Sequence, residues 1–181
     1  MKFIPTKIPG VLIIEPKVFG DSRGFFCETY RQKLFSKNGI RARFVQDNHS
    51  RSAKGVVRAF HYQAPPRAQA KLVRVIRGSV FDVVVDLRKG SKTYGRHVGE
   101  ILSAENKKMI YIPEGFAHGF LALEDNTEVL YKTTDYYSPK HERGILWNDP
   151  ALKIKWPVLN TPYLLSPKDA RNPTLFDALK K

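Results

Sequence analysis

Short runs of hydrophobic and β-branched residues alternate with turn residues along most of the chain. Pro, Gly, Asn and Asp, which favour turns, separate these runs at short and fairly even intervals. Strands of this length and spacing are typical of an antiparallel sandwich or barrel rather than of alternating strands and helices. The expected strands cover residues 55–61, 71–77, 80–87, 97–102, 108–112, 120–123 and 128–134.

The two ends of the chain differ from this regular middle. A β-prone run at residues 11–15 predicts an early strand, and residues 29–37 give the one clear helical stretch, which an Asn-Gly pair ends. From Asn148 the sequence becomes Pro-rich and irregular, so we expect it to wrap around the barrel. The sequence therefore predicts one domain over residues 1–181, with an N-terminal arm at about 1–18 and a C-terminal wrap at about 148–181.

Composition limits the class of protein. The chain has 181 residues, of which 42% are hydrophobic and 27% charged, enough for one sizeable core in a globular domain. Its single cysteine, Cys27, excludes an internal disulfide framework. The N-terminus has no apolar signal segment and no run approaches about 18 apolar residues. We therefore expect a cytoplasmic protein that does not enter a membrane.

The net charge of +14 and the pI near 9.9 point to an anionic partner or to a basic surface. The densest basic clusters, such as Lys107-Lys108 and Lys180-Lys181, are only pairs. Zinc-finger spacing, a helix-turn-helix pattern and an aromatic RNA-binding signature are all missing from the sequence. We therefore expect an anionic small-molecule substrate and no nucleic-acid partner.

Two motifs resemble the signatures of cupin barrels, but the metal ligands of the first are replaced. That signature has H-x-H and then a glutamate seven residues before a glycine; here His61 is followed by Gln63, and Lys71 lies seven residues before Gly78. Residues 113–118 fit the second signature, P-x-G-x-x-H. A transition metal needs neutral or anionic ligands, and an ammonium group at the third position repels it. The resemblance implies a mostly β, cupin-type antiparallel sandwich or jelly-roll barrel with a few short helices, and no metal.

The faces of the expected strands leave two questions open. Lys71 shares a face with the apolar Val73 and Val75, which is costly unless an anion meets it or the side chain reaches water at the barrel mouth. Arg58 lies on the face opposite His61 if the strand alternates strictly. Either the strand breaks its register between them, or Arg58 reaches the pocket around the sheet edge.

Eight motifs in order identify the chain as similar to the dTDP-4-dehydrorhamnose 3,5-epimerase family, over about residues 19–173. One departure is the pair Ala59-Phe60, where the family commonly has Gly-Leu, and we expect it to reshape the pocket wall beside His61. The motifs lie at residues 19–28, 46–50, 57–63, 71–73, 112–120, 130–132, 136–137 and 165–169.

The resemblance implies a cofactor-independent isomerase of dTDP-rhamnose biosynthesis. Such an enzyme converts dTDP-4-dehydro-6-deoxy-D-glucose into dTDP-4-dehydro-L-rhamnose, by removing and returning protons at C3 and C5 through an enolate. His61 then serves as the base that removes the proton. Asp169 orients it, Lys71 stabilises the enolate oxygen, and Tyr131 donates a proton on the opposite face of the sugar.

The resemblance also assigns the residues that hold the dTDP-linked 4-keto-6-deoxy sugar. Arg23 and Arg58 clamp the diphosphate, and Glu28 accepts a hydrogen bond from thymine, on which Tyr137 stacks. His118 contacts the sugar. The remaining substrate-binding positions are Gln46, Asp47, Asn48, Glu142 and Lys168. The family is a homodimer with an exchanged N-terminal strand, which places Arg23 and Glu28 near the other chain's pocket; residues 11–15 fit such an edge strand.

Two alternatives remain open at the level of sequence. One is a relative that inverts only C3 or only C5, or that acts on another nucleotide sugar, with Ala59 and Phe60 as the positions that decide. The other is a metal-dependent or non-catalytic sugar-binding cupin.

Overall fold

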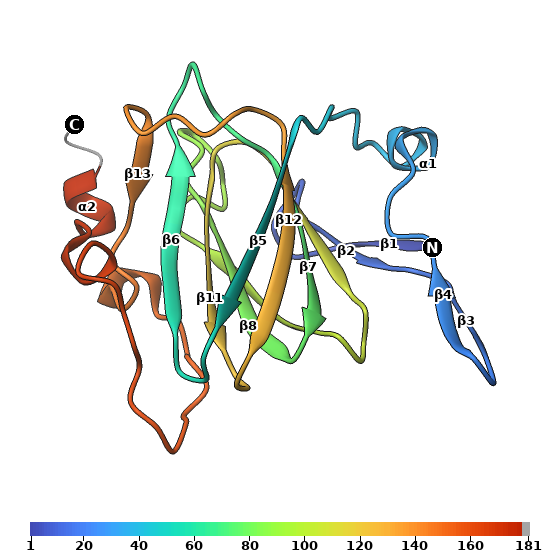
Figure 1. Cartoon of the computed structure of the whole chain (residues 1–181). Helices are drawn as coiled ribbons and strands as arrows, with labels where there is room; N and C mark the ends of the chain where they lie inside the picture. Colours follow the sequence, from blue (N-terminus) through green and yellow to red (C-terminus); the bar gives the residue numbers. More distant parts are fainter. Residues whose placement is uncertain (179–181) are drawn as a thin grey trace.

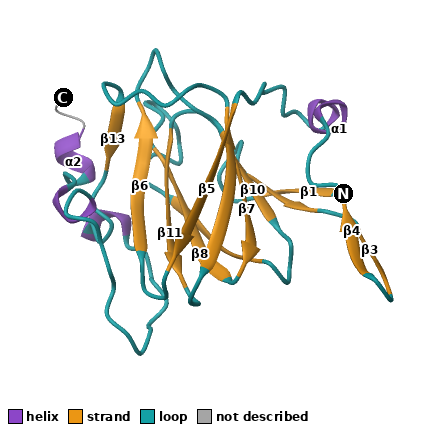
Figure 2. Cartoon of the chain, in the orientation of Figure 1, coloured by secondary structure: helices purple, strands orange, loops and turns teal. Residues whose placement is uncertain are grey.

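The chain folds into two large antiparallel sheets packed face to face, with a small hairpin at one side (Figures 1 and 2). The computed structural model describes residues 1–178, so residues 179–181 of the expected C-terminal wrap lie outside the described part. The prediction of a mostly β, antiparallel sandwich with a few short helices is confirmed.

The strands pair in an order that brings distant parts of the chain together. The six-stranded sheet runs β1 (Lys2–Pro5), β2 (Leu12–Glu15), β10 (Met109–Ile112), β7 (Lys71–Arg77), β12 (Thr127–Thr133) and β5 (Gln46–Ser52). The five-stranded sheet runs β13 (Glu142–Gly144), β6 (Val57–Gln63), β11 (Phe116–Ala122), β8 (Ser79–Asp86) and β9 (His97–Ser103). The hairpin consists of β3 (Val18–Asp21) and β4 (Gly24–Cys27).

Helical segments are short and lie at the periphery (Figure 2). The helix α1 (Gln32–Lys37) begins three residues later than residues 29–37 predict, because Arg31 before it is extended. Tyr30 instead packs its ring against Phe35 and Phe44. The others are α2 (Leu175–Ala178) and the 3₁₀ turns η1 (Pro150–Leu152) and η2 (Asp169–Arg171). No helix in the described residues is long and apolar enough to cross a membrane.

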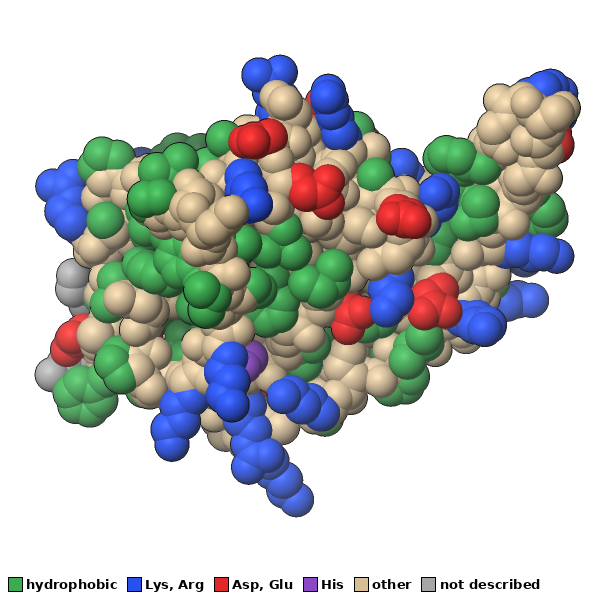
Figure 3. All heavy atoms as spheres, turned by 90° about the horizontal axis from the view of Figure 1, so that it is seen from below, with side chains coloured by type: hydrophobic (Ala, Val, Ile, Leu, Met, Phe, Trp, Pro, Cys, Tyr) green, Lys and Arg blue, Asp and Glu red, His purple; other side chains and the backbone are tan. Residues whose placement is uncertain are grey.

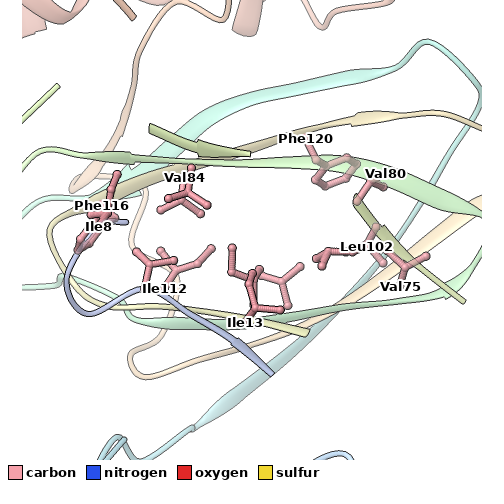
Figure 4. Close-up of a cluster of buried hydrophobic side chains, with 14 residues drawn as sticks. Ile8, Ile13, Val75, Val80, Val84, Leu102, Ile112, Phe116 and Phe120 are labelled. Atoms are coloured by element: carbon pink, nitrogen blue, oxygen red, sulfur yellow. The ribbon is translucent and has the colours of Figure 1, made fainter. Parts of the chain in front are cut away.

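A hydrophobic core fills the space between the two sheets (Figure 4). Ile13 and Ile112 on the six-stranded sheet meet Val84 and Phe120 on the five-stranded sheet, and all are nearly inaccessible to solvent. Burial of such side chains is the main favourable contribution to folding. One end of the space between the sheets is left to polar residues, which form the site described below.

The outer face of the five-stranded sheet is covered by the last part of the chain. Trp156 packs against Phe60 and Phe81, and Leu152 and Leu175 join the same hydrophobic cluster. Because the sheet is covered on both faces, every residue of β11 is buried. The outer face of the six-stranded sheet is partly covered by α1 through Phe35.

The N-terminal region departs from expectation in one respect. Residues 11–15 were expected as an edge strand, but β2 pairs with both β1 and β10 of its own chain, so it is an interior strand of the sheet. The hairpin β3–β4 is instead the segment that projects from the body, on the side away from β6 (Figure 1). It carries the exposed rings of Phe19, Phe25 and Phe26.

The excess positive charge is distributed around the surface. On the face shown in Figure 3, Lys and Arg side chains lie mainly around the rim, and hydrophobic side chains are exposed in the middle. Some basic residues pair with carboxylates, for example Arg67 with Asp135 and Lys108 with Glu100. The charge on this face is therefore not gathered in one continuous basic strip.

Candidate active site

A β-bulge in β6 places both Arg58 and His61 on the face of the strand that turns toward the other sheet, where Arg58 stays exposed to solvent. His61 is opposite His118 on β11, whereas Arg58 is opposite Phe120, so three steps along β6 match two along β11. The extra residue interrupts the alternation of faces, as bulges do beside functional sites. The first of the two alternatives, a break in register, is therefore correct.

The bulge also moves Ala59 and Phe60 out of the pocket. Both are fully buried in clusters on the outer face of the sheet, where Phe60 packs against Trp156. The expectation that this pair reshapes the pocket wall is therefore wrong. Gly119 lies opposite the bulge, where an added Cβ would be 2.8 Å from the Arg58 carbonyl oxygen.

The interior side chains at this point surround a cavity of about 270 Å³. It lies at the end of the sandwich where β6 ends and β7 begins, the upper end in Figure 1. Strands of both sheets contribute to it, and two loops close it. Its lining consists of Gln46, Asn48, His61, Tyr62, Gln63, Gln69, Lys71, Tyr131, Thr133, Tyr137 and Glu142.

His61 and Asp169 form a close pair at this cavity, with Nε2 and Oδ1 2.5 Å apart. Asp169 is buried at the start of η2, where its amide donates to the hydroxyl of Ser166. Burial alone would raise the pKa of Asp169, but bonds and charge from His61, with further bonds from Ser166 and Ala59, hold that pKa below its ordinary value. The carboxylate therefore stays ionised and can orient the imidazole, whose Nδ1 has no partner among the described residues.

Lys71 supplies a buried cation beside this pair. Its side chain is only 8% exposed, and its Nζ donates to the carbonyl oxygen of His61 at 3.2 Å. Burial lowers the pKa of Lys71 to about 8. The negative charges of Asp82 and Glu142 act in the opposite direction but do not cancel this effect. The group is thus mostly protonated at neutral pH, and of the two alternatives for Lys71, an inward cation is correct.

Tyr131 lies on β12, in the sheet opposite His61, and lines the same cavity. Burial raises the pKa of its hydroxyl, an effect that Glu142 increases and the charge of Arg58 opposes. The phenol therefore stays protonated at neutral pH and can serve as a proton donor.

A second histidine–carboxylate pair lies beneath the cavity. The Nε2 atom of His118 and Oδ2 of Asp82 are 2.8 Å apart, and both side chains are buried. The other oxygen of Asp82, Oδ1, has no hydrogen-bond partner among the described residues. Asp82 was not among the residues predicted from sequence, although a carboxylate inside the apolar run of β8 was a signal, since an unpaired charge is costly in a core.

The far end of the cavity has a tyrosine in a network of polar side chains. The hydroxyl of Tyr137 donates to Glu142 at 2.7 Å, and its amide donates to Oε1 of Gln46 at 3.0 Å. Lys168 pairs with Glu142 at 2.6 Å. Burial would raise the pKa of Glu142, but Lys168 and the Tyr137 hydroxyl outweigh it and keep that pKa low.

Some of the predicted binding residues do not line this cavity. Arg58 faces the interior but donates to Ser52 and to the carbonyl of Arg51, and His118 lies below the lining. Asp47 points outward between Gln46 and Asn48, because alternate residues of β5 face opposite sides, and it pairs with Lys132. The structure therefore does not bring Asp47 into the site.

Arg23 and Glu28 lie outside the cavity of their own chain. Arg23 is at the tip of the projecting hairpin, where it pairs with Asp21, and Glu28 pairs with Arg31. Among residues 1–178, no group of three or more His, Cys, Asp or Glu side chains is placed to hold a metal ion.

The fold and the cavity together define a cupin-type barrel that brings a histidine–carboxylate pair, a lysine and a tyrosine to one site, a set suited to moving protons. The family model for dTDP-4-dehydrorhamnose 3,5-epimerase matches residues 5–177. The chain belongs to this family, and it is accordingly an isomerase of dTDP-rhamnose biosynthesis.

Individual relatives agree over nearly the whole chain. The dTDP-4-dehydrorhamnose 3,5-epimerase of Shigella flexneri is 57% identical, with 98% of each chain covered. A 3,5-epimerase of Legionella pneumophila, solved in complex with dTDP-4-keto-L-rhamnose, is 51% identical with a TM-score of 0.93, covering 97% of this chain and 93% of that chain. An epimerase of Mycobacterium tuberculosis is 40% identical with a TM-score of 0.95, covering 99% and 91%.

Proposed function

We propose that this chain binds dTDP-4-dehydro-6-deoxy-D-glucose in the cavity and inverts C3 and C5 with His61 as base and Tyr131 as acid. The observation that carries the proposal is the joint placement of the His61–Asp169 pair, Lys71 and Tyr131 around one cavity. The Legionella relative solved with dTDP-4-keto-L-rhamnose supports this class of ligand.

His61 removes the proton in the first step. The C4 ketone acidifies the hydrogens on C3 and C5, so an imidazole is a strong enough base to remove one of them. The C–H bond breaks, its electrons move into the C–C bond and onto the C4 oxygen, and the imidazole becomes an imidazolium. The ionised Asp169 stabilises that cation and holds the ring in place.

Lys71 stabilises the enolate that forms. An ammonium group fixed in a buried site needs little reorganisation when negative charge develops, and one such donor is worth roughly 3–4 kcal/mol. Its anchor on the His61 carbonyl holds the cation close to the base. The reaction needs no cofactor, because a proton leaves and returns beside a ketone with no net oxidation.

Tyr131 returns the proton from the other side. It extends from the sheet opposite His61, so a sugar between them would present one face to each. The hydroxyl gives its proton to the carbon as the enolate collapses. The resulting tyrosinate then regains a proton from solvent and the His61 imidazolium releases one to solvent, which restores both groups. Transfer to the face opposite the abstraction is what inverts the centre.

The nucleotide is expected at the end of the cavity that carries Tyr137. Its ring can stack on thymine, and Gln46 and Asn48 present amides to the ribose or the base. Arg58, turned inward by the bulge, suits the diphosphate. Glu142 and Lys168 extend this polar surface. His118 lies beneath the cavity lining, paired with Asp82, and the family resemblance alone assigns it to the sugar.

The partner expected from sequence is a second copy of the chain. The projecting hairpin exposes the aromatic rings of Phe19, Phe25 and Phe26. An exposed apolar patch of this kind often marks a contact with another protein chain. Arg23 and Glu28 are carried by the hairpin and by the segment just after it, away from their own cavity. A homodimer in which each hairpin reaches the neighbour's cavity would use both features.

Incubation with dTDP-4-dehydro-6-deoxy-D-glucose in heavy water tests the reaction. We expect deuterium to appear at both C3 and C5. Mass spectrometry measures how much deuterium is incorporated, and NMR shows at which carbon. Label at one carbon alone would establish a single inversion instead. His61→Ala and Tyr131→Phe should bind dTDP as the wild type does while product formation falls by about 10²–10⁴-fold; product formation at the normal rate in either variant would contradict its role.

A further inference from the structure

Gln63 occupies the position where the first cupin signature has its second histidine, and the chemistry proposed above gives it no task. Its side chain is only 5% exposed. It stands at the end of β6, directly after the strand segment that carries His61. A buried amide must satisfy its donors and acceptor locally, so its partners indicate its role.

The amide of Gln63 joins two loops that close the cavity. Its Nε2 donates to the carbonyl of Arg67 at 2.6 Å and to that of Tyr136 at 3.2 Å. Its Oε1 accepts from the amide of Ser138 at 2.6 Å. One side chain thereby bridges the loop after β6 and the loop after β12, and it holds the second loop on both sides of Tyr137.

Tyr137 depends on such support because little else fixes it. Its side chain is 55% exposed, so packing contributes little to its orientation. Apart from the bond of its hydroxyl to Glu142, Tyr137 donates its amide to Gln46. On either side of it, the carbonyl of Tyr136 accepts from Gln63 and the amide of Ser138 donates to Gln63. Loss of the Gln63 bonds would loosen the backbone on both sides of the ring, where Tyr136 would keep only its bond to Asp135 and Ser138 only its bonds to His141 and Glu142.

We propose that Gln63 is a positioning residue that presets Tyr137 for the nucleotide, so that it governs substrate affinity rather than proton transfer. This rests on the proposed function in that Tyr137 is taken to contact the nucleotide. A residue of this kind acts by lowering the ordering cost of binding. Its removal should therefore raise KM and the Kd for dTDP while kcat changes little.

Gln63→Glu is the sharpest test. The two side chains have nearly the same shape, but the substitution replaces the NH2 group, a donor, with an oxygen, an acceptor. The carboxylate can still accept from Ser138, but it faces the carbonyls of Arg67 and Tyr136 with no proton to donate. We expect the Kd for dTDP at pH 8, measured by calorimetry, to rise about tenfold, the effect of one or two lost hydrogen bonds. A protonated carboxyl group donates again, so the ratio to wild type should return toward one near pH 5.

Three companion variants make the result specific. Gln32→Glu adds the same charge on exposed α1 and should leave the Kd unchanged. Gln63→Leu removes the hydrogen bonds without adding a charge, so it should weaken the binding of dTDP equally at both pH values. This variant also tests the proposal if Gln63→Glu does not fold at pH 8. In a Tyr137→Ala background, either substitution at position 63 should cause almost no further rise in the Kd for dTDP, because the two residues act through one interaction.

The outcomes separate this inference from the proposed reaction. Wild-type affinity in both variants at position 63, a loss of kcat without a change in Kd, or full additivity with Tyr137→Ala would each overturn it. The binding measurement needs no turnover, so a failure of the deuterium exchange would count against the proposed reaction alone.

Discussion

The Nζ atom of Lys71 donates a hydrogen bond to the main-chain carbonyl of His61 at 3.2 Å. The two residues belong to β7 and β6, which lie in different sheets, so this bond crosses the sandwich. It ties a buried cation to the backbone of the residue that carries the imidazole. The position of the ammonium relative to the base is thus set by two strands rather than by a mobile side chain, which is the preorganisation that stabilisation of an oxyanion requires.

Lys71→Met tests the role of that cation. Methionine has a similar length and no charge, so the cavity keeps its shape while the enolate loses its partner. We expect kcat to fall about 10²–10³-fold, the usual effect of losing one such donor, while the Kd for dTDP stays within a factor of about two. Steady-state kinetics and calorimetry measure the two quantities, and a weakened Kd with normal kcat would instead assign Lys71 to binding.

The pH dependence of the reaction follows from the same residue. Burial lowers the pKa of Lys71 from 10.5 to about 8, so the cation is present below pH 8 and is lost as the pH rises through that value. We expect kcat/KM to decline above about pH 8. The raised pKa of Tyr131 keeps the phenol protonated over this range, so it cannot cause the decline. The residual activity of Lys71→Met should lack this decline, and its persistence there would assign it to another group.

The free energy of unfolding should rise over the pH range in which kcat/KM declines. Between about pH 8 and 10.5 the unfolded chain holds a proton on Lys71 that the folded chain has lost. The free energy of unfolding therefore rises with pH over this range as far as Lys71 is concerned. Denaturant unfolding of wild type and Lys71→Met isolates the effect, because only the wild type should gain this stability.

The bulge in β6 makes Gly119 a sensitive position. An added Cβ at Gly119 would be 2.8 Å from the carbonyl oxygen of Arg58 and 3.1 Å from the amide nitrogen of Phe60, both backbone atoms that cannot move aside easily. We expect Gly119→Ala to destabilise the fold by about 1–3 kcal/mol. We also expect it to reduce kcat, since relief of the clash shifts Arg58 or His61.

Gly20→Ala serves as the stability control, because an added Cβ there finds its nearest atom at 3.7 Å. It should change the free energy of unfolding far less than Gly119→Ala does. Denaturant unfolding measures both variants. Equal losses in the free energy of unfolding would mean that the bulge places no special demand on Gly119.

These features also explain which parts of the structure the sequence could predict. The strand at residues 71–77 was predicted with its observed bounds, because its apolar pattern is clear. The strand β5 was missed because its inner residues are the polar ones that line the cavity, so the apolar alternation that marks a strand is absent. The hairpin β3–β4 was missed because its aromatic residues face solvent within one chain.

The structure brings some of the residues expected from sequence to one cavity and leaves others outside it. His61 and Asp169 are 108 residues apart, so only family resemblance could pair them. Asp47 was included for its place in a motif, although its neighbours at 46 and 48 already occupy the inner face. The inward turn of Arg58 depends on a bulge, which no periodic pattern contains.

The proposed exchange of hairpins makes a prediction that a single chain cannot satisfy. If Arg23 serves the neighbour's cavity, Arg23→Ala and His61→Asn damage the same site from different chains. Each variant alone should lose most of its kcat/KM, by about 10-fold or more for Arg23→Ala through the lost diphosphate contact. In a mixed dimer, one of the two sites then has both wild-type residues.

Refolding the two variants together at equal amounts should therefore restore activity. Random association makes about half of the dimers mixed, each with one intact site, so about a quarter of wild-type activity should return. Light scattering on the same samples gives the oligomeric state, and a mixture of each variant with itself is the control. A mixture no more active than its components would place Arg23 with its own chain's cavity, and a monomer in solution would rule out the shared site.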